Sequence, residues 1–114
     1  MAASASAQRF KFVFFVPTSH LEVCKKAVFA AGAGRYPCSN YTECCFTSVG
    51  TGSFRPGEGA NPHIGTPGTV EEVQEARLET VCVGEDVTRR AVEALKKAHP
   101  YEEVVYDVFK LEDF

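Results

Sequence analysis

The chain has 114 residues, of which 45% are hydrophobic and 24% are charged, with a formal net charge of −3. This length fits one domain with a single packed core, and the slight acidity excludes the basic surface with which proteins bind nucleic acid. No stretch approaches the roughly 18 apolar residues of a membrane span, and residues 1–8 lack the apolar centre of a signal peptide. We therefore expect a soluble, cytoplasmic protein with a disordered leader over residues 1–8 and one domain over residues 9–114.

The first half of the domain predicts a strand, a helix and a second strand. Residues 9–16 are rich in aromatic and β-branched residues, which favour strands, and Pro17 ends this run. Ser19 and Glu22 have the spacing of a capping box, which predicts a helix over residues 19–31. Gly32 and Gly34 then end the helix, and residues 41–49 again have the composition of a strand.

The second half of the domain repeats this order. Residues 75–83 alternate in character, which predicts a third strand. One face of this strand carries Ala76, Leu78, Thr80 and Cys82. Asp86 is the expected N-cap of a second helix, whose apolar stripe comprises Val87, Ala91, Leu95 and Ala98. Pro100 ends this helix, and residues 103–111 predict a fourth strand.

The order strand, helix, strand, strand, helix, strand predicts an α+β, ferredoxin-like (βαββαβ) sandwich, in which two helices cover one face of a four-stranded antiparallel sheet. The other face should be polar, yet Val13, Phe15, Val105 and Phe109 place apolar groups there or beside it. A contiguous exposed apolar patch usually marks an interface. We therefore expect oligomerisation through the open sheet face, with aromatic side chains tucked under loops as the alternative.

A glycine-rich segment over residues 50–68 joins the second and third strands. It lacks the Lys-Ser or Lys-Thr of a P-loop, and Arg55 stands where a dinucleotide fingerprint has its third glycine. Its glycines allow an anion-binding nest of backbone amides near the Arg55 guanidinium. The alternative is a loop that packs on a neighbouring subunit through Phe54, since long loops are usually functional or disordered.

Cysteines and histidines give weak signals for chemistry. The five cysteines include no Cys-x-x-Cys pair and are expected to be reduced, mostly packed in the core, and the three histidines lack the spacing of a helical zinc site. The sequence therefore predicts no cofactor and no metal, and a site assembled from Cys44, Cys45 and His63 stays an alternative. The "HPYEE" of residues 99–103 could gather an imidazole, a phenol and two carboxylates, or could simply end a helix.

Several segments resemble, in the same order, the PII/CutA-like domain of the Nif-three-like dinuclear-metal-centre proteins. They are "FVP" (15–17), "AGAGRY" (31–36), "GTGSFRPGEGANPHIG" (50–65), "EEVQEARLE" (71–79) and "EALKKAHPYEE" (93–103). The resemblance implies a ferredoxin-like, usually trimeric module that stands without the family's metal-binding domain, so that no enzymatic activity is carried over. The chain departs from the family at "YPCSNYTECC" (36–45), where relatives have a shorter turn.

These observations predict a non-enzymatic homotrimer of unestablished role that holds a small anionic ligand or nucleotide at its subunit borders, with no nucleic-acid or membrane partner. The expected ligand-binding residues are Gly50, Thr51, Gly52, Phe54, Arg55, Asn61, His63, Gly65, Arg77, Glu79, His99 and Tyr101. Copper or zinc binding of the CutA type and a purely structural trimer scaffold are the alternatives.

Overall fold

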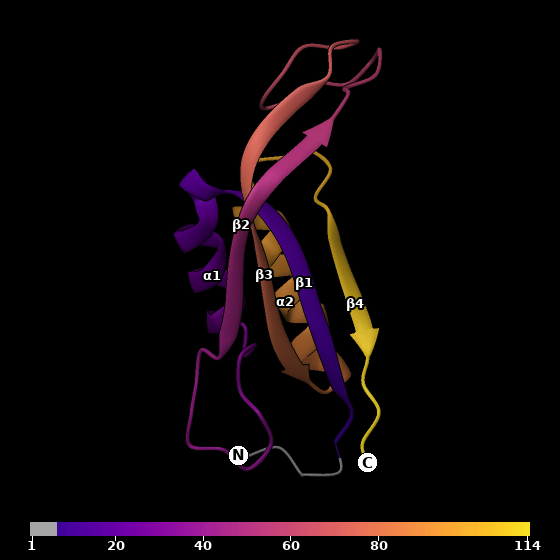
Figure 1. Cartoon of the computed structure of the whole chain (residues 1–114). Helices are drawn as coiled ribbons and strands as arrows, with labels where there is room; N and C mark the ends of the chain where they lie inside the picture. Colours follow the sequence, from indigo (N-terminus) through magenta and orange to yellow (C-terminus); the bar gives the residue numbers. More distant parts are fainter. Residues whose placement is uncertain (1–6) are drawn as a thin grey trace.

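The chain folds into one four-stranded antiparallel sheet with both helices on the same face, in a computed structural model that describes residues 7–114 (Figure 1). The strands are β1 (Arg9–Pro17), β2 (Cys45–Phe54), β3 (Glu71–Val83) and β4 (Tyr106–Lys110). The helices are η1, a 3-10 helix (Thr18–His20), α1 (Leu21–Ala30) and α2 (Glu85–Ala98). The sheet order β2-β3-β1-β4 confirms the predicted ferredoxin-like arrangement.

The core lies between the sheet and the helices. Strand alternation turns Phe12 and Phe14 of β1 and Leu78 of β3 toward the helices, where all three are fully buried. From the helix side, Val28 and Leu95 close the same cluster. Each such side chain contributes about 1.5–3 kcal/mol by leaving water, so this layer supplies the main driving force for folding.

The cysteines divide between core and surface. Cys24 and Cys82 are buried, and burial raises the pKa of each thiol to about 11. Both thiols are therefore protonated, and both side chains pack in the core. Cys38 and Cys45 are exposed and Cys44 is intermediate. The expectation that most cysteines pack in the core is therefore wrong, because the connection before β2 and the first residue of β2 lie at the surface.

Both helix starts differ from the sequence predictions. Ser19 lies inside the 3-10 helix, and its Oγ is 3.0 Å from His20 Nδ1, so the predicted capping box does not form and α1 begins at Leu21. The N-cap of α2 is Gly84 rather than Asp86. Gly84 has φ of +89°, a conformation that glycine adopts without strain. With Gly84 as the N-cap, α2 begins at Glu85, earlier than the sequence predicts.

The strands β2 and β3 extend further toward the glycine-rich loop than predicted. β2 includes residues 50–54 and β3 begins at Glu71, so the connecting loop is reduced to residues 55–70. Pro17, the last residue of β1, pairs with Glu75, and beyond this point β2 and β3 continue as a two-stranded ribbon that projects past the sheet (Figure 1). Cross-strand pairing here overrides the weak strand preference of glycine.

At their other ends, β2 starts at Cys45 and β4 at Tyr106, four and three residues later than predicted. The expected leader over residues 1–8 falls mostly outside the described residues and stays a prediction. Within residues 7–114, no helix combines the length and apolar character that a membrane crossing requires.

Candidate functional site

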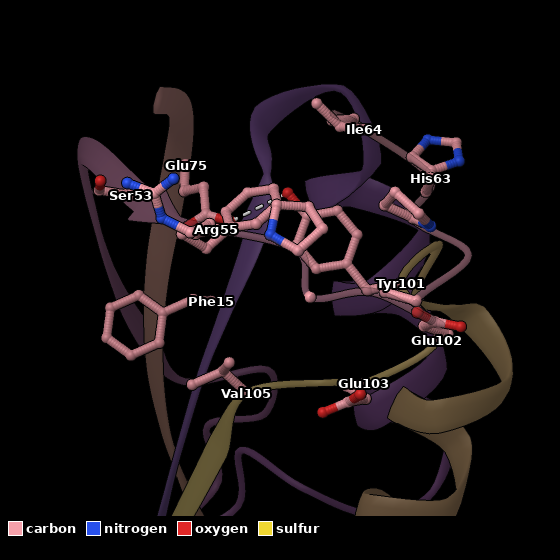
Figure 2. A pocket seen from close by; sticks show the side chains of 16 residues that line it. Phe15, Ser53, Arg55, His63, Ile64, Glu75, Tyr101, Glu102, Glu103 and Val105 are labelled. Atoms are coloured by element: carbon pink, nitrogen blue, oxygen red, sulfur yellow. Dashed lines mark hydrogen bonds between the residues drawn. The ribbon is translucent and has the colours of Figure 1, made fainter. Parts of the chain in front are cut away.

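The loop of residues 55–70 and the HPYEE turn meet at one end of the sheet. Together with the end of β1 they border a pocket of about 500 Å³, lined from β1, β2, the loop, β3 and residues 101–105 (Figure 2). The two segments are joined directly, since the Asn61 backbone N–H donates to Glu102 Oε1 at 2.9 Å, across 41 positions of sequence. The volume falls in the range of sites for small molecules.

The loop is closed at its base by two hydrogen bonds. Arg55 Nη1 donates to the Gly68 carbonyl at 2.6 Å, and the Gly68 N–H donates to the Pro56 carbonyl at 2.7 Å. Gly68 has φ of +85°, which glycine adopts without strain. Arg55 lines the pocket and makes no ion pair with any residue between 7 and 114, so its remaining N–H groups are free to bind an anion.

Tyr101 stands at the centre of the pocket wall. Its ring centroid lies 5.9 Å from that of Phe54 and 6.3 Å from that of His63. Its hydroxyl donates to Glu75 Oε2 at 3.2 Å, drawn as a dashed line in Figure 2. Burial, together with the charge of Glu75 and the hydrogen bond to it, raises the pKa of Tyr101 to about 12. The phenol is therefore a neutral hydrogen-bond donor throughout the physiological pH range.

Gly52 is needed where the Glu75 side chain crosses the ribbon. A Cβ on Gly52 would collide with the Glu75 carboxylate. Gly52 pairs with Val73, so Glu75 is its diagonal neighbour, within reach of a long side chain. The absence of a side chain at position 52 lets Glu75 lie across the ribbon and reach Tyr101.

His99 does not line the pocket but holds Tyr101, which does, in place. It is 6% exposed, its Nδ1 accepts the Tyr101 backbone N–H at 3.1 Å, and its Nε2 donates to the Phe15 carbonyl at 2.7 Å. Burial lowers the pKa of His99, while the bond to Phe15 acts in the opposite direction. A neutral imidazole with its proton on Nε2 thus ties the end of α2 to the end of β1 and positions Tyr101.

The structure brings together part of the predicted site. Five of its residues line the pocket: Gly52, Phe54, Arg55, His63 and Tyr101. Seven do not: Gly50, Thr51, Asn61, Gly65, Arg77, Glu79 and His99. Asn61 contacts the turn through its backbone, whereas Arg77 and Glu79 pair with each other at 3.2 Å on β3. Ligand binding by these residues stays a prediction.

The predicted site omitted other residues that line the pocket, among them Phe15, Glu75, Glu102 and Glu103. The HPYEE motif contained a signal for Glu102 and Glu103, but the interpretation of this motif as the end of a helix left them out. Glu75 gave no local signal, because its place depends on the strand pairing that carries it beside Gly52.

The alternative metal site does not assemble within one chain. Cys45 begins β2 and Phe54 ends it, which separates them by about 30 Å at 3.3 Å per residue. His63 lies beyond Phe54, in contact with His20 and Tyr101. Between residues 7 and 114 no group of three or more His, Cys, Asp or Glu side chains has an arrangement suited to a metal ion.

Comparison with curated proteins gives clear sequence relatives, although no protein-family model matches the chain. The GTP cyclohydrolase 1 type 2 homolog of Halalkalibacterium halodurans is 42% identical over 111 residues, which are 97% of this chain and 29% of that protein. The Bacillus subtilis protein of the same name is 43% identical over 102 residues, 90% of this chain and 26% of that protein. The chain therefore spans less than a third of the length of these relatives.

Solved structures show the same relationship. A Bacillus cereus protein related to NIF3 superposes with a TM-score of 0.78 at 39% identity, over 98% of this chain and 29% of that one. GlnK of B. subtilis in complex with ATP has a TM-score of 0.60 at 13% identity, over 96% of this chain and 85% of that one. Divalent ion tolerance protein CutA1 of Ehrlichia chaffeensis has a TM-score of 0.60 at 9% identity, over 96% and 86%. The last two share the fold alone. Sequence and fold together identify the chain as a NIF3-like domain of the PII/CutA-like type.

Proposed function

We propose that this chain is a self-associating, non-enzymatic module that holds a small ligand with an anionic group in the pocket beneath its glycine-rich loop. The observation that carries the proposal is the convergence of the two motif segments, the loop and the HPYEE turn, on one pocket of about 500 Å³. Concave sites with a few convergent polar groups are where proteins usually bind small molecules.

Arg55 is the expected anion-binding group. A guanidinium carries five N–H donors in a planar fork that suits carboxylate and phosphate. One of these donors is used by the Gly68 carbonyl, which anchors the side chain at the pocket edge. The GlnK–ATP complex offers a precedent for nucleotide binding on this fold.

Self-association is expected through the open face of the sheet. Phe46 of β2 and Phe109 of β4 lie on the face opposite the helices and are 68% and 53% exposed. These two side chains lie on the outer strands β2 and β4, on the face that no helix covers, and such exposed apolar groups favour an interface between copies. We expect the homotrimer that the family resemblance implies, and with it additional walls for the pocket.

The cyclohydrolase activity in the relatives' name is not part of this proposal. This chain corresponds to 29% of the H. halodurans protein and 26% of the B. subtilis protein. We therefore assign no residue of this chain to an activity of the longer proteins.

Two measurements test the proposal. Native mass spectrometry of untagged protein should report an oligomer together with any retained small molecule. The purine monophosphates GMP and AMP, added singly at millimolar concentration, should raise the melting temperature for at least one of them. Arg55→Ala should abolish that rise and lower the unliganded melting temperature only slightly, because Arg55 and its hydrogen bond to the Gly68 carbonyl are exposed.

Arg89→Ala is the matched control, since Arg89 is an exposed arginine on α2 that pairs with Glu85 at 3.7 Å and does not line the pocket. It should keep the full ligand-induced rise. A rise that persists in Arg55→Ala would contradict the proposed role of Arg55.

A further inference from the structure

The charges in the pocket wall are uneven. Three carboxylates, those of Glu75, Glu102 and Glu103, line the pocket together with one guanidinium, that of Arg55. The pocket lining also includes one histidine, His63, whose side chain is exposed. A site built for anions alone would not gather three acceptor-only groups around a single cation.

The carboxylates differ in how many of their oxygens are already used. Glu75 is held by the Tyr101 hydroxyl, and Glu102 Oε1 accepts the Asn61 backbone N–H. Glu103 has no hydrogen bond or ion pair with any described residue. Glu102 Oε2 and both oxygens of Glu103 therefore remain available as acceptors for a ligand.

The aromatic wall separates these acceptors from the cation. Figure 2 shows Arg55 on one side of the Tyr101 ring and Glu102 and Glu103 on the other. The Tyr101 and Phe54 rings are tilted by 57° at 5.9 Å, and Phe15 adds a third apolar ring to the pocket. Such rings offer stacking surfaces to a flat heterocycle.

We infer that the ligand is a flat heterocycle that presents paired N–H donors to the Glu102 and Glu103 carboxylates and carries a single anionic group toward Arg55. A guanine-type ring fits this description, because its ring N–H and its 2-amino group lie side by side and can donate together to a carboxylate. An adenine-type ring fits poorly, because the corresponding ring nitrogen is an acceptor and faces the carboxylate unfavourably. The inference rests on the proposed function and names its ligand class.

The same charge balance sets the number of phosphates. One guanidinium can bind one phosphate, but further phosphates would lie near the pocket carboxylates without a cationic partner from the described residues. The pocket therefore favours a nucleoside monophosphate over a triphosphate.

Calorimetric titration with GMP, IMP, AMP and GTP, without magnesium and at one fixed ionic strength, tests the inference. GMP should bind roughly tenfold or more tightly than AMP, the scale of one bidentate contact to a base edge. IMP, which lacks the 2-amino group, should fall between them, and GTP should bind more weakly than GMP. Glu103→Gln should reduce the ratio of GMP to AMP affinity severalfold, since an amide replaces one acceptor oxygen with a donor.

Glu93→Gln on the exposed side of α2 is the matched control and should leave the ratio unchanged. Glu103 makes no contact on which the fold depends, so its variant should melt at the wild-type temperature. Equal affinities for GMP and AMP, both lost in Arg55→Ala, would overturn the inference and leave the proposed function standing. Failure of all four nucleotides to bind would overturn both.

Discussion

At the scale of single residues, His99 shows how a buried polar group organises the site. Both of its ring nitrogens are hydrogen-bonded to backbone groups, one on β1 and one in the turn that carries Tyr101. Because both bonds are made within the chain, His99 is a positioning residue. The sequence predicted His99 to be a ligand-binding residue, because the sequence shows that an imidazole is present but not which partners its two nitrogens have.

His99→Ala should lower the free energy of unfolding by about 1–3 kcal/mol, because it leaves a partly buried carbonyl and a partly buried N–H without their partner. Urea denaturation monitored by circular dichroism measures the change. His63→Ala provides the comparison, since His63 is exposed and makes ring contacts only, and should stay within about 0.5 kcal/mol of the wild type. Equal effects of the two substitutions would contradict the positioning role.

The lowered pKa of His99 predicts a dependence of stability on pH. In the unfolded chain the imidazole returns to a pKa near 6.5 and binds protons more readily than in the folded protein. The contribution of His99 is therefore complete above about pH 6.5 and is lost as the pH falls from there toward the folded pKa. The free energy of unfolding should fall more between about pH 7.5 and about pH 5.5 in the wild type than in His99→Asn. Identical pH profiles of the two proteins would rule out this linkage.

At the scale of elements, the ribbon of β2 and β3 beyond β1 needs support from side chains. A two-stranded ribbon alone is marginally stable in water. Here the Glu75 side chain crosses the ribbon to Tyr101, and Gly52 leaves room for it. The sequence predicted glycine flexibility in this segment, whereas the structure uses position 52 for close packing within a strand.

Two glycine substitutions separate these roles. Gly52→Ala should destabilise the protein by about 1 kcal/mol, because the new methyl group displaces the Glu75 carboxylate from the Tyr101 hydroxyl and breaks their hydrogen bond. Gly50→Ala should be neutral or stabilising by about 0.5 kcal/mol, since a Cβ there meets open space and alanine restricts the unfolded chain. Thermal and urea unfolding of both variants measure the difference. Equal free energies of unfolding would show that the contact of Glu75 with Tyr101 across the ribbon does not stabilise the protein.

At the scale of the whole molecule, the open sheet face determines whether the chain acts singly or as an assembly. Phe109→Asp should lower the average mass in sedimentation velocity at micromolar concentration while keeping the helix and strand content, because it places a charge on the proposed interface. Val23→Asp is the control, since Val23 is 50% exposed on α1 and away from that face. A wild-type protein that sediments as a single chain would contradict the proposed self-association.

The sequence by itself determined the type and order of the elements. The alternation in β1 and β3 and the stripe of α2 are local consequences of side-chain period, and they were sufficient to predict the ferredoxin-like fold. The sequence also indicated Arg55, Phe54 and Tyr101 as members of one site, because the motif segments that contain them are unusual. Local patterns do not set where elements end, and the start of α1 and the extent of β2 accordingly differ from the predictions.

Only the tertiary structure decided how the site is built. The placement of Glu75 against Gly52, the tautomer of His99 and the separation of Arg55 from Glu102 each depend on contacts between residues far apart in the chain. Strand register brings such residues together, and a shift of one position would turn each strand side chain to the other face. Register depends on the packing of the whole sheet, which is why no single segment of the sequence contained this information.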